Sequence, residues 1–148
     1  MPVWVRMRLR RPGSADEVEV SAKVNTGFTV GPLPVVRLPK AVAERLGFDL
    51  AEAEILPGIR DTALRPLSAR LLGPVEVRVA VQDRPTRWVR ATAIYMRGSA
   101  TVLINDVLAG RRLLGLVIED SETGLWRLAD DPPGTVRRSS RPEYWPEE

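Results

Sequence analysis

Two segments near the start of the chain alternate apolar and polar residues. Residues 3–10 and 18–24 both show the two-residue period that is typical of a half-buried β-strand. Residues 11–14 read Arg-Pro-Gly-Ser, and the proline and glycine favour a turn. We therefore expect an N-terminal β-hairpin whose second strand runs directly into residues 25–27.

A short apolar strand and a helix are expected next. Residues 35–38 predict the strand, and Pro39 suits the first turn of a helix over residues 39–46. Gly47 can end that helix, because glycine readily adopts the left-handed conformation of a C-terminal cap. The expected buried side of the helix consists of Val42, Ala43 and Leu46.

The middle of the chain is rich in strand patterns. Further strands are expected at residues 53–56, 63–72, 75–81, 87–96 and 101–104. The first two flank residues 57–61, so they predict a long hairpin with a loose tip. Residues 101–104 are almost entirely apolar, which is typical of a central strand.

The last elements close a single mainly β domain, for which we expect the bounds 1–129. The length of 148 residues also points to one domain. Asp106 can cap a helix over residues 107–114. Residues 116–119 and 125–128 then predict a closing hairpin.

Residues 130–148 differ in character from this domain. They are rich in proline, arginine and serine, and Tyr144 and Trp145 stand near their end. Two interpretations stay open. The segment is either a flexible tail or a tail whose aromatic side chains dock on a partner chain.

The absence of cysteine and histidine restricts the possible chemistry. It excludes disulfides, thiol nucleophiles, zinc fingers and Ser-His-Asp catalysis. A Ser-Lys dyad is possible in principle, but no Ser-x-x-Lys spacing supports one at Lys23 or Lys40. Paired carboxylates are therefore the natural candidates for any hydrolytic activity, and we expect no metal and no cofactor.

The charge pattern favours a solvated surface over a nucleic-acid interface. The net charge is only +3, and the arginines are interspersed with acids. One competing interpretation is a small β-barrel that binds RNA, because Arg6, Arg8 and Arg10 share one strand face. No aromatic residue interleaves them along that strand face, so we expect no nucleic-acid partner.

We expect a cytoplasmic protein without a membrane partner. No apolar run approaches the length that spans a bilayer, and residues 1–6 lack the apolar core of a signal peptide. Side-chain amides are confined to Asn25, Gln82 and Asn105, whereas prolines number 13. This composition is typical of a chain selected for heat resistance, so it indicates a thermophile.

The tetrapeptide Val24-Asn25-Thr26-Gly27 resembles the Asp-Thr-Gly turn of retropepsin-like aspartic proteases, with asparagine in place of the aspartate. Leu38-Pro39 at the helix start and the block over residues 102–108 follow in the order that this family shows. The similarity spans about residues 3–128 and looks closest to short archaeal-type members. It implies a closed β-barrel half with two short helices, completed by homodimerisation.

The resemblance also implies where a peptide would bind. The two-fold axis of the homodimer would pass between two copies of Asn25. The hydroxyls of Thr26 would brace the two turns, and Gly27 would let them approach. An extended peptide or protein substrate would lie under a flap. The implied flap and substrate-binding residues are Phe28, Pro57, Gly58 and Ile59.

Asparagine at position 25 predicts a chain that does not cleave peptides. The family's chemistry needs a pair of carboxyls, one as a base that activates water and one as an acid. An amide fills the same volume and can hold a water molecule, but it has almost no basicity. The implied activity is therefore that of an aspartic endopeptidase whose present copy is inactive.

The origin of Asn25 stays open at this point. It is either natural, which would make the chain a peptide- or protein-binding pseudoprotease, or an introduced Asp-to-Asn change. The scarcity of asparagine elsewhere favours the introduced change. A third reading is that residues 25–27 form an ordinary turn, since asparagine and glycine are common turn residues.

Two further features of the sequence bear on this site. Ile104 stands where many relatives of the family carry glycine, which concerns packing rather than chemistry. Asp16, Asp61 and Asp106 could supply another carboxylate by residue type. We expect none of them to do so, because the first two fall in predicted turns and the third caps a helix.

Overall fold

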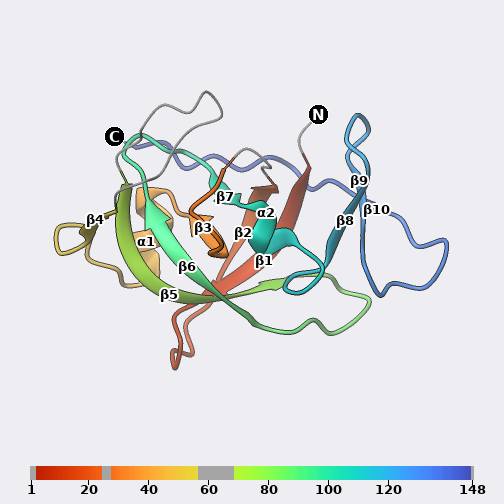
Figure 1. Ribbon diagram of the computed structural model, residues 1–148, viewed down its shortest axis with the longest axis horizontal. Coiled ribbons are helices and arrows are strands. Elements are labelled where there is room, and N and C mark those ends of the chain that lie inside the picture. The colour runs from red at the N-terminus through yellow and green to blue at the C-terminus, as the bar shows by residue number, and fades with distance from the viewer. Residues whose placement is uncertain (1–2, 25–27, 57–68, 148) are drawn as a thin grey trace.

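The computed structural model describes residues 3–24, 28–56 and 69–147 (Figure 1). The described strands and helices are β1 (Trp4–Arg10), β2 (Val18–Val24), β3 (Val35–Arg37), α1 (Lys40–Arg45), β4 (Glu54–Leu56), β5 (Ala69–Val79), β6 (Val89–Tyr95), β7 (Val102–Ile104), α2 (Asp106–Ala109), β8 (Leu116–Asp120), β9 (Leu125–Leu128) and β10 (Arg137–Arg138). No helix among these residues is long and apolar enough to cross a lipid bilayer.

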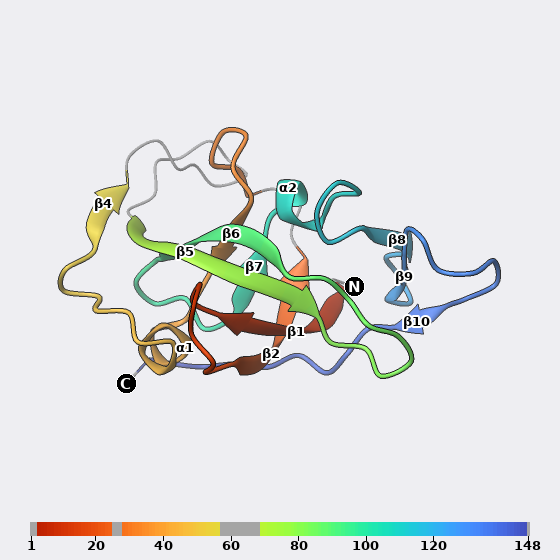
Figure 2. The same cartoon turned by 90° about the horizontal axis from the view of Figure 1, so that it is seen from below.

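Six strands form a closed barrel. Their order is β1-β2-β7-β3-β6-β5, and an antiparallel pairing of β5 with β1 closes the circle (Figure 2). The pairs β2–β7 and β3–β6 are parallel, and the other pairs are antiparallel. Strand β4 lies outside the circle, against β5. The expected mainly β barrel with two short helices is confirmed, as is the N-terminal hairpin.

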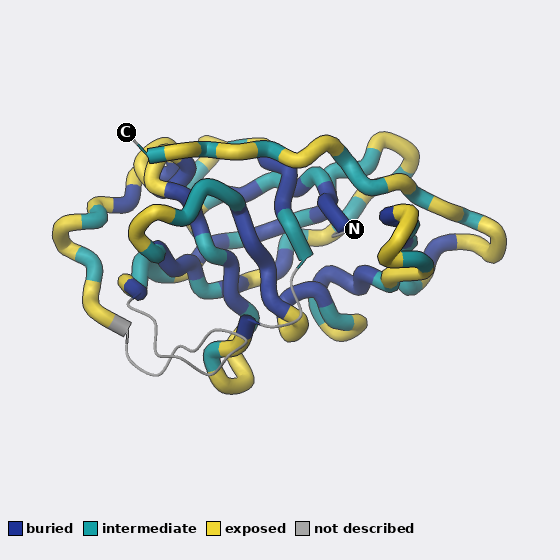
Figure 3. The backbone as a smooth tube through the Cα atoms, turned by 90° about the horizontal axis from the view of Figure 1, so that it is seen from above, coloured by how far each residue is buried: buried dark blue, intermediate teal, exposed yellow. Residues whose placement is uncertain are grey.

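The alternating pattern of β1 separates the interior of the barrel from its outer surface. Met7 and Leu9 are fully buried in the main core, whereas Arg6 and Arg8 point outward and are half-buried. Strand β5 repeats the arrangement, with Val77 inside. Figure 3 shows the buried positions gathered on the central strands. Burial of these apolar side chains is the main stabilising contribution to the fold.

A second, smaller core cluster lies on the other side of β3 and β7. Its buried members are Phe28, Val35, Ala69, Ile94 and Leu103. Val36 and Ile104, which are neighbours of Val35 and Leu103 in sequence, belong to the main core. Both strands are therefore buried on both faces. This explains the continuous apolar run at residues 101–104 and confirms the expected central strand.

Helix α1 agrees with its prediction, whereas α2 does not. Pro39 stands just before α1, Gly47 follows it with φ of 90°, and the three expected apolar residues are buried. Helix α2 ends at Ala109, so the expected helix over residues 107–114 was wrong. Gly110 is extended there, with φ of −62° and ψ of 168°, and the chain leaves the helix.

Strand β5 is longer than expected. We predicted separate strands at residues 63–72 and 75–81, but a single strand runs from Ala69 to Val79. Its pairing with β6 shifts register between Leu71 and Gly73. Gly73 has a φ of 133°, which a side chain would strain, so glycine permits the irregularity without ending the strand.

The C-terminal segment packs on its own chain instead of standing apart. Strand β10 pairs with β9 of the closing hairpin β8–β9, and the three strands form a second sheet. Beyond β10 the chain (blue in Figures 1 and 2) returns along β1 toward α1. The backbone N–H of Ser140 donates to Trp4 O at 2.8 Å, and that of Trp145 donates to Ala100 O at 2.6 Å.

Charge holds the start of this segment in place. Asp131 has a fully buried carboxylate that accepts hydrogen bonds from Arg84 and Arg137 at 3.0 Å. We call the set of Arg84, Arg137, Asp83, Asp130 and Asp131 the tail cluster. Two arginines meet three aspartates there. Each arginine of the cluster therefore has two carboxylate partners. The cluster joins the tail to the loop between β5 and β6.

The aromatic side chains of the segment also contact the barrel. Tyr144 packs edge-on against Trp4, with ring centroids 5.8 Å apart. Trp145 packs against the main core, and the guanidinium of Arg45 lies 4.9 Å from its ring. These contacts join the segment to its own chain, and the role expected for residues 130–148, a flexible or partner-docking tail, stays a prediction.

Candidate active-site region

The two elements that the resemblance singles out fall largely outside the described residues. The catalytic positions Asn25, Thr26 and Gly27 lie there. So do the flap positions Pro57, Gly58 and Ile59. The structure describes the strand ends that flank both elements, together with Phe28.

Strand β2 ends directly before the tripeptide. Its last residue, Val24, pairs in parallel with Ile104 of β7. The backbone N–H of Val24 also donates to Val3 O at 3.0 Å. The end of β2 is therefore held from both sides, by β1 and by β7.

Asn105 is the best-connected polar side chain of this region. It is 1% exposed, and its Oδ1 accepts hydrogen bonds from the N–H groups of Val35 at 3.0 Å and Leu108 at 3.1 Å. Its Nδ2 donates to Leu33 O at 2.9 Å. One side chain thus joins the start of β3, the first turn of α2 and the loop after Phe28.

Asn105 corrects one prediction and adds a residue that the sequence argument missed. We expected Asp106 to cap the helix, but the capping side chain belongs to Asn105. Asp106 is instead the first residue of α2, and burial raises the pKa of its carboxyl. The rarity of asparagine could have indicated this residue. A residue type that occurs only twice is expected to have a specific role at each position.

Ile104 and Phe28 both face apolar surroundings. Ile104, the residue that departs from the family's glycine, is fully buried in the main core. Phe28, an implied substrate-binding residue, is only 5% exposed and belongs to the second core cluster. Val30 packs partly buried against the same cluster. Phe28 therefore packs within the second core cluster and exposes little of its ring.

The described residues include the base of the expected flap hairpin. Leu56 at the end of β4 pairs antiparallel with Ala69 at the start of β5. The guanidinium of Arg70 donates to Ala53 O at 3.0 Å and ties the two strands together. Ile55 is 73% exposed, the largest exposure of any large apolar side chain described.

The structure describes two of the three aspartates that could supply another carboxylate by residue type. Asp16 precedes β2, and the seven residues of that strand separate it by about 20 Å from Val24, the last residue described before the tripeptide. Asp106 is the first residue of α2. Asp61 lies outside the described residues. In the part of the chain that the structure describes, no three Asp or Glu residues are grouped as a metal site would need.

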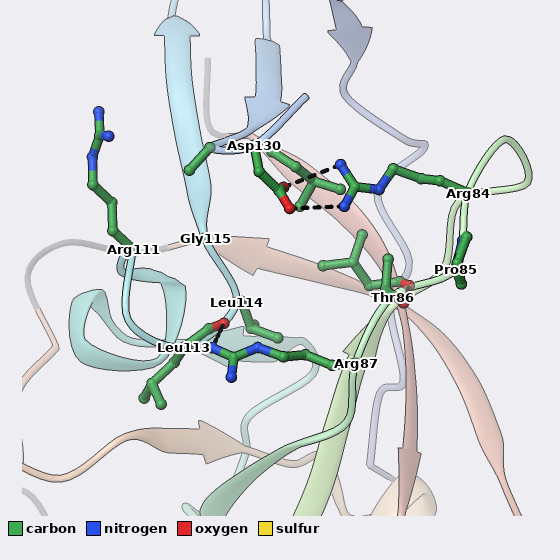
Figure 4. A pocket seen from close by; sticks show the side chains of 12 residues that line it. Arg84, Pro85, Thr86, Arg87, Arg111, Leu113, Leu114, Gly115 and Asp130 are labelled. Carbon is green, nitrogen blue, oxygen red and sulfur yellow. Dashed lines mark hydrogen bonds and ion pairs between the residues drawn. The ribbon is translucent and has the colours of Figure 1, made fainter. Parts of the chain in front are cut away.

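A pocket of about 470 Å³ lies elsewhere, between the β5–β6 loop and the closing hairpin (Figure 4). Its polar groups are already engaged. Arg84 donates to Asp130 at 2.9 Å, and Arg87 donates to the backbone oxygen of Leu113 at 3.0 Å. Arg111 points away from both pairs in Figure 4. This pocket lies between the β5–β6 loop and the closing hairpin, and its contacts join the two.

Comparison of the chain with protein-family models, with curated proteins and with solved structures gives no match. The closed barrel, the parallel pairing of β2 with β7 and the contacts of Asn105 are thus the structural basis for a functional interpretation.

Proposed function

We propose that the chain is one half of a homodimeric, retropepsin-like aspartic endopeptidase and that Asn25 prevents it from cutting. One observation supports this most. The strand that leads into Asn25 pairs in parallel with β7, and β7 leads into the helix that Asn105 caps. The sequence resemblance rests on these two blocks, which are far apart along the chain, and the barrel brings them side by side.

The proposed chemistry requires two chains. Each chain has a single such turn, so a two-fold axis must pair it with the turn of a second copy. Two aspartates at that axis would share one proton, because two close carboxyls cannot both ionise readily. Two asparagines would keep the shape and bind water, but neither could act as the base.

The proposed ligand is an extended peptide. Among the described strands β4 pairs with β5 alone, so its other edge offers backbone groups for strand-like hydrogen bonds. Ile55 adds an exposed apolar side chain at that position.

The test compares the chain with its Asn25→Asp variant on a broad peptide library from acid to neutral pH. We expect cleavage by the variant alone, with an acid-leaning bell-shaped pH profile. Asn105→Asp is the matched control, since it makes the same chemical change at the other asparagine and should give no cleavage. Light scattering should find both the chain and Asn25→Asp as dimers.

The alternative function is that of a natural peptide- or protein-binding module on the same scaffold. It would be favoured if neither form cut any library peptide while both formed the same dimer and bound peptides equally well. A monomer that neither cuts nor binds peptides would contradict both functions.

A further inference from the structure

The outer surface of the barrel gathers four arginines, and one of them, Arg78, has no carboxylate partner among the described residues. A second pocket, of about 360 Å³, lies where β1 and the end of β5 meet the loop after β5. Its ionisable lining consists of Arg6, Arg8, Arg78, Arg84 and a single acid, Glu19. We call these five residues the barrel pocket. Arg84 is paired with the aspartates of the tail cluster, and Arg6 also lies 3.7 Å from Glu143, so Arg6, Arg8 and Arg78 against Glu19 and Glu143 leave a formal excess of one positive charge.

The single acid of the barrel pocket is already occupied. Glu19 accepts a hydrogen bond from Arg6 at 2.7 Å and another from Arg8 at 3.1 Å. Arg84 lines the pocket, but its guanidinium is already paired with Asp130 and Asp131 of the tail cluster. Arg8 binds Glu19 through Nε, and its two terminal nitrogens make no hydrogen bond within the described part of the chain, so they can donate to a ligand.

Arg78 has no carboxylate partner among the described residues. Its Nε is buried and makes no hydrogen bond within the described part of the chain. The guanidinium lies 5.0 Å from the centre of the Trp88 ring, which orients its plane. Arg10 lies against the same ring at 3.8 Å. Trp88, which precedes β6, therefore lies against two arginines of the outer surface, although no aromatic residue interleaves the arginines along β1 itself.

The register of the barrel places two of these arginines directly opposite each other. Arg8 of β1 and Arg78 of β5 are cross-strand partners. Like charges in this position repel, so the pair is unfavourable unless an anion lies between them. A carboxylate ligand would supply one negative charge, whereas a phosphate group supplies nearly two and matches the fork of a guanidinium.

We propose that the barrel pocket binds a phosphate group between Arg8 and Arg78. The phosphate belongs either to a small free ligand, which carries nearly two negative charges, or to the backbone of a single-stranded nucleic acid, which carries one per phosphate; a guanidinium fork binds the phosphate oxygens of both. This inference rests on the outer barrel surface alone and does not depend on the function proposed for Asn25.

The test measures binding of pyrophosphate by calorimetry at low ionic strength. Arg78→Gln and Arg8→Gln should each weaken binding by roughly tenfold or more, because each removes charge-assisted hydrogen bonds. Arg90→Gln is the matched control. Arg90 is also an exposed arginine of the outer barrel surface, opposite Glu76, but it does not line the pocket. Its replacement should change the affinity less than about twofold.

A second arm identifies the source of the phosphate. If a single-stranded oligonucleotide competes with pyrophosphate and Arg78→Gln weakens both, the source is nucleic acid. If only pyrophosphate binds, the source is a small ligand. No binding of either probe, or an equal loss in Arg90→Gln and Arg78→Gln, would overturn the proposal. Circular dichroism of each variant shows whether it is folded, and Arg78→Lys keeps the charge should Arg78→Gln unfold.

Discussion

The tail cluster and the barrel pocket meet at Arg84, yet their charges are balanced in opposite ways. In the tail cluster, two arginines contact three aspartates, and one of these, Asp131, is fully buried. In the barrel pocket, Arg6 and Arg8 share the exposed Glu19, and Arg78 has no carboxylate partner among the described residues. Removing one partner of a buried, hydrogen-bonded charge pair is costly to the fold, whereas charge on an open surface contributes little to folding and is available to a ligand.

The largest expected effect is on the tail cluster. Asp131→Ala removes the partner of Arg84 and Arg137 and the acceptor of the Leu128 N–H at 2.8 Å. Breaking a buried pair from one side should lower the free energy of unfolding by about 3–5 kcal/mol. Urea unfolding measures this change.

Asp130→Ala is the matched control for that experiment. The carboxylate of Asp130 is 76% exposed, so removing it should lower the free energy of unfolding by less than about 1 kcal/mol. Equal losses in the two variants would remove the distinction between buried and exposed pairs on which the comparison depends.

Acid should weaken the same cluster. The hydrogen bond from Arg137 is the main reason that the pKa of Asp131 lies well below its ordinary value. The folded-state pKa is thus lower than that of the unfolded chain, about 3.9. The stabilisation should be complete above that pH and lost as the pH falls below it. Urea unfolding at a series of pH values should show a shallower decline in Asp131→Ala, and an unchanged slope would contradict this assignment.

Local patterns predicted much of the fold. Alternation located β1 and β2, proline and glycine bounded α1, and the apolar run located β7. These features depend on neighbouring residues, so a single sequence contains them. The length of α2 was predicted wrongly because the helix ends where Gly110 adopts an extended backbone. The residue pattern does not indicate that conformation.

Contacts between distant segments could not be predicted in this way. Asn105 joins Leu33, Val35 and Leu108, and nothing near it in sequence indicates the first two. The pairing of Arg8 with Arg78 depends on the register that closes the barrel, which a strand pattern does not encode. The candidate turn at residues 25–27 was recognised from a resemblance, and its role stays a prediction.

Replacing an arginine should change the free energy of unfolding differently in the barrel pocket and in the tail cluster. Arg78→Gln removes a charge that faces Arg8, so the free energy of unfolding should stay constant or rise by up to about 0.5 kcal/mol. Arg137→Gln, the same change in the tail cluster, should instead lower it by more than about 1 kcal/mol. Urea unfolding of both variants checks this contrast, and a loss of similar size in both would contradict it.

Glu19→Gln should have the smallest effect on stability and a measurable one on binding. Glu19 is 41% exposed, so losing its pairs with Arg6 and Arg8 should cost less than about 1 kcal/mol of unfolding free energy. The same change removes the only negative charge of the barrel pocket and frees the Arg8 guanidinium. Pyrophosphate should then bind roughly threefold more tightly at low salt. Calorimetry and urea unfolding of this one variant test both statements, because a carboxylate needed only for the fold would lower stability without improving the affinity.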